Sequence, residues 1–214
     1  MNTTKIFKWA AIGAIINIVI LIPSFIFGAL LVSQQQNPYV QMATFALLFI
    51  GIIAGLFILY GYFKLAKALR LKFLKIMVII SFAFVIILSL LDLVLIFLMS
   101  ETIITALSFT LLIFSLIELI FGISVLKLKE KFKGIAVALG IVYVIYGAVK
   151  LVQGAFFNSD ILSIFSLIIG IAISILEAIL FFRAAKSFQD IISKAEPIKK
   201  IISKNAKKRL TSSS

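Results

Sequence analysis

Long runs of hydrophobic residues, separated by short polar segments, set the pattern of this chain. Six of these runs contain 22 to 24 residues each, and they cover residues 9–32, 42–63, 76–99, 103–126, 134–157 and 161–182. A helix needs about 20 apolar residues to cross the hydrocarbon core of a bilayer. Strict alternation of apolar and polar positions, the pattern of a transmembrane β-barrel, is absent. The sequence therefore predicts six transmembrane helices.

The composition agrees with a lipid environment. The chain of 214 residues is 63% hydrophobic and 14% charged, and its mean hydropathy is +1.24. Soluble domains are about 45–50% apolar and about 25% charged. We therefore expect an all-α, polytopic membrane protein in which the six spans form one bundle.

The basic residues lie almost entirely in alternate connections. Twenty of the 21 Lys and Arg residues fall before the first run, between the second and third, between the fourth and fifth, or after the sixth. Short loops rich in Lys and Arg stay on the cytoplasmic side. This split predicts a multi-pass protein of the cell membrane with both termini in the cytoplasm, and contacts between its basic loops and anionic lipid headgroups.

The remaining connections are residues 33–41, 100–102 and 158–160. Because the last two are so short, each must close a tight helical hairpin, and three hairpins would make up the bundle. Lys67, Lys127 and Lys186 are spaced 60 and 59 residues apart near the ends of the three returning helices. This spacing is compatible with a threefold internal repeat, although any six-span chain with short loops has a period of this size.

The composition changes after Phe188, which divides the chain into a transmembrane domain, residues 1–188, and a basic tail, residues 189–214. In the tail, isoleucines recur at helical spacing among basic residues beyond Pro197, which we expect to separate this piece from the sixth helix. The pattern predicts an amphipathic helix on the membrane surface. Its lipid-contacting residues would be Lys199, Lys200, Lys204, Lys207, Lys208 and Arg209.

Four ionisable residues lie inside the predicted spans: Asp92, Glu118, Lys150 and Glu177. A charge at a helix centre costs about 2.5–3.5 kcal/mol on insertion scales, so these residues should face the bundle interior. They form the candidate intramembrane polar site. Asp92 and Lys150 lie at similar depths in the outer half, so we expect them to form a buried ion pair. Whether the four charges fix helix packing or line a path for a solute stays open at this stage.

Small residues also suggest a packing surface. The segment Gly51-Ile52-Ile53-Ala54-Gly55 places two glycines four residues apart within the second run. Such pairs let two membrane helices approach closely. The motif predicts a close helix contact here, although chance matches are frequent in apolar runs.

Several classes of chemistry lack the residues that they require. The chain has no cysteine and no histidine, and it has no phosphate-binding lysine loop, dinucleotide glycine fingerprint or nucleophile elbow. We expect no enzymatic activity, no cofactor and no metal site. The net charge of +13 would suit nucleic acid, but its position beside apolar runs favours the membrane surface instead.

Two functional hypotheses from different classes follow. The first is an accessory or scaffold protein without catalytic activity, whose buried charges hold the helices together and which has an unknown membrane protein as partner. The alternative is a small transporter or channel whose intramembrane carboxylates bind a proton or a cation. A continuous polar path, with the carboxylates lining a water-filled cavity, would favour the alternative, whereas carboxylates sealed between helices would favour the first.

Overall fold

In the part of the chain that it describes, the computed structural model contains six helices. They are α1 (Thr3–Ser33), α2 (Pro38–Ala68), α3 (Lys72–Phe97), α4 (Glu101–Leu126), α5 (Lys129–Ala155) and α6 (Asp160–Thr211). The structure describes the backbone of residues 3–34, 37–97, 101–155 and 160–211, and the side chains of these ranges except at 32, 95, 97, 101–104, 107, 154–155, 160 and 190–211.

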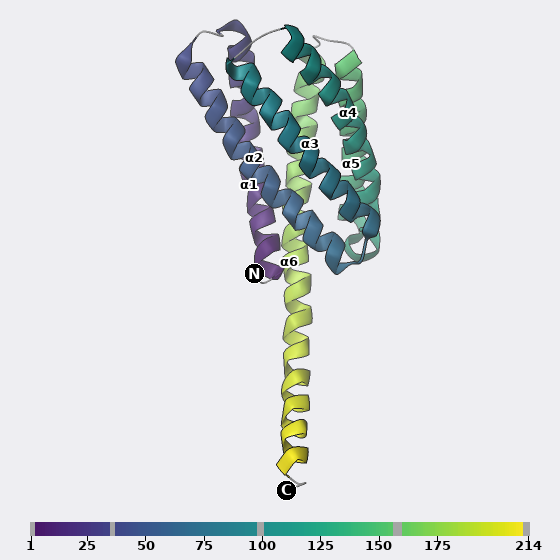
Figure 1. The fold of residues 1–214 in the computed structure, drawn as a ribbon. Coiled ribbons are helices and arrows are strands. Elements are labelled where there is room, and N and C mark those ends of the chain that lie inside the picture. Colours follow the sequence, from purple (N-terminus) through teal and green to yellow (C-terminus); the bar gives the residue numbers. More distant parts are fainter. Residues whose placement is uncertain (1–2, 35–36, 98–100, 156–159, 212–214) are drawn as a thin grey trace.

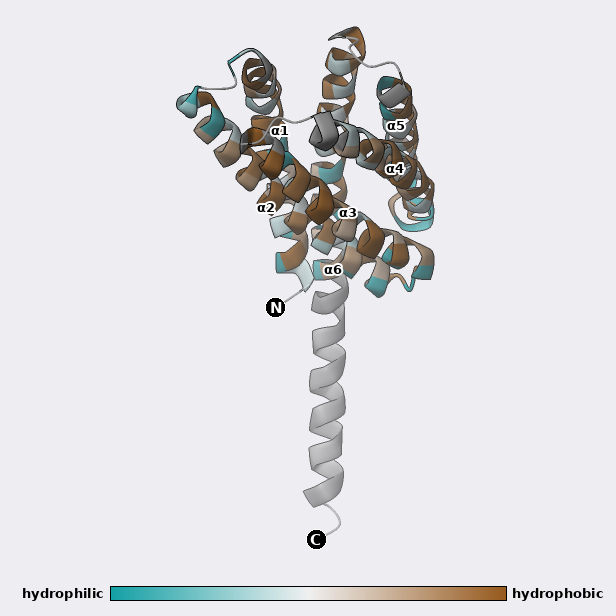
Figure 2. Cartoon of the chain, turned by 45° about the horizontal axis from the view of Figure 1, so that its top comes forward, coloured by the Kyte–Doolittle hydropathy of each residue, from teal (hydrophilic) through white to brown (hydrophobic). Residues whose placement is uncertain are grey.

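Each of the six helices is long and apolar enough to cross a membrane, which confirms, for the described residues, the prediction of an all-α fold with six helices of spanning length. Large hydrophobic side chains point outward all along the bundle, including Val19 at 68% exposure and Phe109 at 64%. Figure 2 shows mostly hydrophobic positions over the bundle, with hydrophilic positions gathered near the helix ends. An apolar outer surface of this kind suits lipid and makes the chain consistent with a multi-pass membrane protein.

The helices form a closed ring in the order of the chain. Each helix packs against the next, and α6 closes the ring by packing against α1. The helices run side by side, and the chain termini lie at the same end of the bundle (Figure 1). Since α2 also packs on α3, and α4 on α5, the contacts do not single out three hairpins. The three-hairpin arrangement and the threefold repeat are therefore not confirmed.

Two kinds of helix end illustrate how the sequence defines the elements. Asn37 caps α2, because its side-chain oxygen accepts a hydrogen bond from the backbone N–H of Tyr39 at 3.0 Å, and Pro38 occupies the first helical position. At the other end of α2, the N–H of Leu71 bonds to the carbonyl of Ala66 at 2.9 Å, while Arg70 has a φ of 57°. This is a Schellman motif in which arginine takes the place that usually belongs to glycine.

The lysine-rich end of the bundle, where the chain termini and the α2–α3 and α4–α5 connections lie, is densely packed. Its fully buried side chains include Phe7 of α1, Tyr62 of α2 and Phe181 of α6. Small residues make room for these rings, since Ala10, Ala11 and Ala14 are all fully buried. Helices in a membrane associate through such packing rather than through the hydrophobic effect.

Glycines bring α4 and α5 into backbone contact. A Cβ atom added at Gly147 would lie 2.8 Å from both the Leu119 nitrogen and the Ser115 oxygen. A Cβ at Gly122 would lie 2.8 Å from the Gly140 oxygen. The close helix contact expected in the segment 51–55 is present, but Gly55 takes no part in it, because nothing lies within 4 Å of a Cβ there. A Cβ at Gly51 would lie 3.3 Å from the Ile20 side chain of α1, and a Cβ at Gly13 would lie 2.8 Å from the carbonyl oxygen of Ala54.

The α6 helix continues far beyond the bundle (Figure 1). It contains 52 residues, and at about 1.5 Å per residue it is about 78 Å long, more than twice the thickness of a bilayer's hydrocarbon core. It runs through Pro197, where the sequence predicts a break. A proline removes only one helical hydrogen bond, so a helix can continue past it at a cost of about 3 kcal/mol.

Candidate functional site

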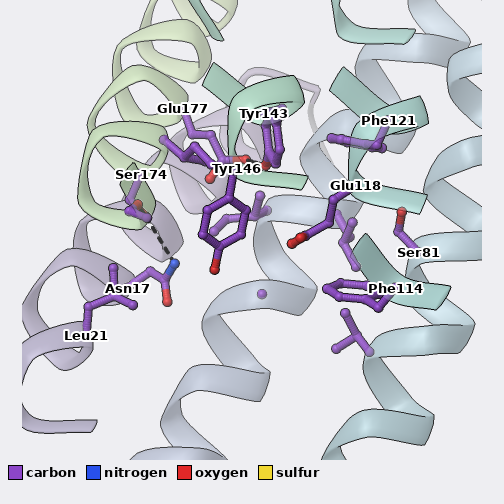
Figure 3. A pocket seen from close by; sticks show the side chains of 16 residues that line it. Asn17, Leu21, Ser81, Phe114, Glu118, Phe121, Tyr143, Tyr146, Ser174 and Glu177 are labelled. Carbon is purple, nitrogen blue, oxygen red and sulfur yellow. Dashed lines mark hydrogen bonds between the residues drawn. The ribbon is translucent and has the colours of Figure 1, made fainter. Parts of the chain in front are cut away.

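A pocket of about 200 Å³ lies inside the helical ring. All six helices contribute to it, and its lining is mixed in character (Figure 3). The polar residues are Asn17, Ser81, Glu118, Tyr143, Tyr146, Ser174 and Glu177, and the aromatic rings of Phe114 and Phe121 join those of the two tyrosines. We call this the central pocket.

Regular helical spacing places these residues on the inner faces of α4 and α5. Phe114, Glu118 and Phe121 follow one another at intervals of four and three residues, so they share one face of α4. Tyr143 and Tyr146 are three residues apart on α5. Because the glycine contacts hold α4 and α5 close together, these two faces meet along one side of the pocket.

Glu177 is the more enclosed of the two acidic residues. Only 2% of this α6 residue is exposed, and its carboxylate accepts a hydrogen bond of 2.5 Å from the Tyr143 hydroxyl. The Tyr62 hydroxyl is buried beside the same carboxylate and interacts with it, but the geometry of the contact falls short of a regular hydrogen bond. Hydrogen bonds to charged groups contribute about 1.5–3 kcal/mol each, so Tyr143 fixes the position of Glu177.

Glu118 lies in a different environment. It has no hydrogen-bond partner in the part of the chain that the structure describes, and its side chain borders the central pocket. In Figure 3 its carboxylate lies between the rings of Tyr146 and Phe114. Glu118 is therefore the acidic group that a ligand in the pocket can reach.

Lys150 lies next to this site on α5. Its ammonium group is 5.5 Å from the centre of the Tyr146 ring, and Glu118 is the carboxylate that acts on it electrostatically. The two are not in direct contact, since no ion pair within 4.0 Å joins them among the described side chains.

The expected ion pair between Asp92 and Lys150 is wrong. Asp92 is half-buried on α3, with no hydrogen-bond or charged partner among the described residues, and it does not line the central pocket. The sequence places Asp92 and Lys150 at similar depths. However, α3 packs mainly against α2 and α4, so Asp92 does not meet α5. Lys150 instead interacts with the charge of Glu118, which lies on α4, the helix that packs most closely against α5.

A polar bridge joins α1 and α6 at the pocket wall. The Asn17 amide donates a hydrogen bond of 3.0 Å to the Ser174 hydroxyl, which in turn donates to the carbonyl of Gly170 at 3.0 Å. Asn17 also lines a second pocket of about 250 Å³, together with Ser24 and Ser89. Because the two pockets share Asn17, Leu21 and Val85, they adjoin.

Aromatic rings close the central pocket toward the lysine-rich end. Tyr62 makes edge-on contacts with Phe121 and Phe181, with ring centres 5.1 and 5.0 Å apart, and Phe121 contacts Tyr143 at 5.2 Å. These four rings come from α2, α4, α5 and α6. We call them the aromatic floor. The second pocket extends away from it, since Ser24 and Ser89 lie farther from the lysine-rich end than Asn17 and Val85 do.

The structure thus brings two of the four ionisable candidates, Glu118 and Glu177, into one pocket and places Lys150 at its edge. The tyrosines and phenylalanines of the pocket were not predicted from the sequence. One sequence pattern could have indicated two of the phenylalanines. Phe114 and Phe121 lie four residues before and three residues after Glu118, so all three share one face of a helix. The side chains of the six proposed lipid-contacting residues of the tail lie outside the described ones.

Among the described residues, no group of three or more Asp and Glu side chains is arranged to hold a metal ion. Comparisons of the chain with protein-family models, with curated proteins and with solved structures give no match. The function must therefore be argued from the site itself.

Proposed function

We propose that this chain is a small membrane transporter, without catalytic activity, that binds a cation or a proton in its central pocket. The observation that carries the proposal is that Glu118 and Glu177, from two different helices, line one pocket surrounded by all six helices. Ionisable side chains inside membrane spans are costly, and they commonly mark the path of an ion or a solute.

The surroundings of Glu118 favour binding over a purely structural role. A carboxylate that only held helices together would be paired with a group on a neighbouring helix. Glu177 has such a partner in Tyr143, whereas Glu118 has none among the described residues. A cation or a proton in the pocket would compensate the charge of Glu118.

The proposal is tested in proteoliposomes. Inward gradients of Na⁺, K⁺, methylammonium and choline are applied one at a time, while dyes report internal pH and membrane potential. We expect at least one gradient to produce a signal that falls at least tenfold in Glu118→Gln. Glu130→Gln, at the exposed start of α5, serves as the matched control and should keep the signal. Wild-type protein that is folded but moves none of these cations and no protons would overturn the proposal.

We also propose an orientation in the cell membrane with both termini in the cytoplasm. The lysine-rich connections Ala68–Lys72 and Leu126–Lys129 lie at the same end of the bundle as the termini (Figure 1), and positively charged loops stay inside. Because the chain has no cysteine, single cysteines can be introduced as probes. A membrane-impermeant maleimide should label Gln34→Cys in intact cells and Lys129→Cys only after lysis. The reverse pattern would contradict the orientation.

The tail is proposed to bind anionic lipid headgroups. Each basic residue near an anionic surface contributes about 1 kcal/mol, and six of them lie between Lys199 and Arg209. A peptide of residues 189–214 should bind vesicles that contain phosphatidylserine and should leave them as salt rises. Equal binding to neutral phosphatidylcholine vesicles would contradict the electrostatic part of this proposal.

An accessory or scaffold role is the second candidate. The extension of α6 beyond the bundle favours it, because a long helix outside the membrane offers a surface to a protein partner. Removal of residues 190–214 separates the two candidates. Transport by the shortened chain at the wild-type rate would support the first, since the described residues that line the central pocket all precede residue 178.

A further inference from the structure

We propose that the ligand of the central pocket is a small organic cation with an ammonium group, held by the Glu118 carboxylate and the surrounding aromatic rings, with the Lys150 side chain as its internal competitor. This inference rests on the proposed function and names the class of its substrate.

The polar groups of the pocket are mostly engaged already. Glu177 is held by Tyr143, and Asn17 and Ser174 are hydrogen-bonded to each other. Glu118 is the acidic side chain left without a hydrogen bond among the described residues of the pocket. A hard inorganic ion such as Ca²⁺ needs about six or more oxygen ligands to replace its water. The Glu118 carboxylate and the hydroxyls of Ser81 and Tyr146 provide fewer than that.

The aromatic lining suits a different kind of cation. Phe114 and Phe121 come from α4, and Tyr143 and Tyr146 come from α5, so rings from two helices line the pocket that Glu118 faces. The rings on either side of the Glu118 carboxylate are those of Tyr146 and Phe114 (Figure 3). An ammonium group within about 6 Å of an aromatic ring centre is attracted to the ring face, and the attraction grows when water is excluded. Rings together with one carboxylate are the groups that recognise alkylated ammonium ions.

The ammonium group of Lys150 already makes contacts of this kind beside the pocket. Its ammonium group lies 5.5 Å from the centre of the Tyr146 ring and interacts with the Glu118 charge. A ligand with an ammonium group would use the same ring and the same carboxylate. Because one carboxylate cannot neutralise two cations, the ligand and Lys150 must compete for Glu118.

The size of the pocket limits the ligand. Its volume of about 200 Å³ is below the range of about 300–1,000 Å³ that is usual for drug-sized ligands. Choline and tetramethylammonium are of suitable size, and 3,3-dimethylbutan-1-ol has the shape of choline without its charge. A comparison of choline with 3,3-dimethylbutan-1-ol therefore separates recognition of charge from recognition of shape.

The test is calorimetric binding of choline to the full chain in detergent, with 3,3-dimethylbutan-1-ol, Na⁺ and K⁺ as comparison ligands. We expect choline to bind at least tenfold more tightly than each of the other three. Glu118→Gln and Tyr146→Leu should each weaken choline binding at least tenfold. The controls Glu130→Gln and Tyr60→Leu, which lie outside the pocket, should leave it unchanged.

Lys150→Met tests the competition separately and should tighten choline binding several-fold. Weaker binding in this variant would overturn the role of Lys150 as a competitor. Binding of Na⁺ or K⁺ as tight as that of choline would overturn the ammonium class while leaving the proposed cation site in place. No binding of any of these cations by folded protein, together with no proton movement in the liposomes, would contradict both.

Discussion

The lysine-rich end of the bundle and its middle differ in packing although both are strongly apolar. At the lysine-rich end, Phe7, Tyr62 and Phe181 are completely buried among alanines and glycines. In the middle, the helices leave the central pocket and the adjoining second pocket. Hydrophobicity therefore does not decide where a membrane bundle is sealed. The decisive factor is whether small residues on one helix face large rings on the next.

The two acidic residues of the pocket repeat this contrast on a smaller scale. Glu177 is 2% exposed and held by Tyr143, next to the aromatic floor. Glu118 faces the pocket without a hydrogen bond from the described residues. We interpret Glu177 as the group that orders the site and Glu118 as the group that binds. The substitutions below test this division.

The largest effect is expected at the α4–α5 contact. A side chain at Gly147 would collide with the backbone of α4 at 2.8 Å, whereas a side chain at Gly55 would enter open space. Overpacking costs about 1–3 kcal/mol and occasionally more, and we expect Gly147→Leu to lower the free energy of unfolding by about 3 kcal/mol. Gly55→Leu should be nearly neutral in the same SDS titration. Equal losses in the two variants would contradict the difference between sealed and open regions.

The next effect concerns the tyrosines of α5. Tyr143→Phe removes the hydrogen bond to the buried Glu177 carboxylate and should lower the free energy of unfolding by about 2 kcal/mol. Tyr146→Phe makes the same chemical change at a hydroxyl without a hydrogen bond among the described residues, and it should have little effect. A comparable loss in both variants would mean that Tyr143 does not hold Glu177.

The six spans could be predicted from the sequence because each depends only on a local run of apolar residues. The side of each helix that faces the bundle interior could not be predicted. In a span such as α3, apolar residues surround the helix on every side, so polarity does not indicate which side faces inward. Asp92 and Lys150 were paired from their positions along the spans, but a pair also requires matching rotation about the two helix axes. That rotation is set by packing details such as the contact of Gly147 with Ser115.

The candidate site was predictable in part for the same reason. Glu118 and Glu177 were identified because a charge is rare in such a run and must face inward. Their aromatic neighbours were not identified, because phenylalanine and tyrosine also occur on the lipid-facing side of the helices. Phe109 and Phe121 lie on the same helix, yet one is 64% exposed and the other 4%.

A smaller effect is expected at Tyr62. Its hydroxyl is buried without a hydrogen bond in the described structure, and an unsatisfied buried polar group costs about 1–3 kcal/mol. Tyr62→Phe keeps the ring contacts with Phe121 and Phe181 and should raise the free energy of unfolding by about 1 kcal/mol. Tyr60→Phe, on the exposed side of α2, is the control and should have no effect. A loss of stability in Tyr62→Phe would show that the hydroxyl has a partner.

The smallest effect lies outside the ring, in the connection after α2. Arg70 has a φ of 57°, a left-handed conformation that glycine adopts without strain. Arg70→Gly should therefore raise the free energy of unfolding by about 1 kcal/mol or less. Lys72→Gly, at the start of α3, should lower it instead. A loss of stability in Arg70→Gly would mean that the arginine side chain contributes more than its backbone strain costs.

The central claim is that the middle of the bundle contains a cation-binding pocket that water can reach, and cysteine chemistry at Gly55 tests it most directly. Gly55→Cys places a thiol in the central pocket without a clash, whereas Gly28→Cys places one on α1 outside it. The reagent is a methanethiosulfonate that carries a trimethylammonium group, applied to the protein in detergent. We predict that the Gly55 thiol reacts readily, and that choline slows its reaction but not that of Gln34→Cys in the connection between α1 and α2. A Gly55 thiol that reacts no faster than the Gly28 thiol, or whose reaction choline leaves unchanged, would contradict the account.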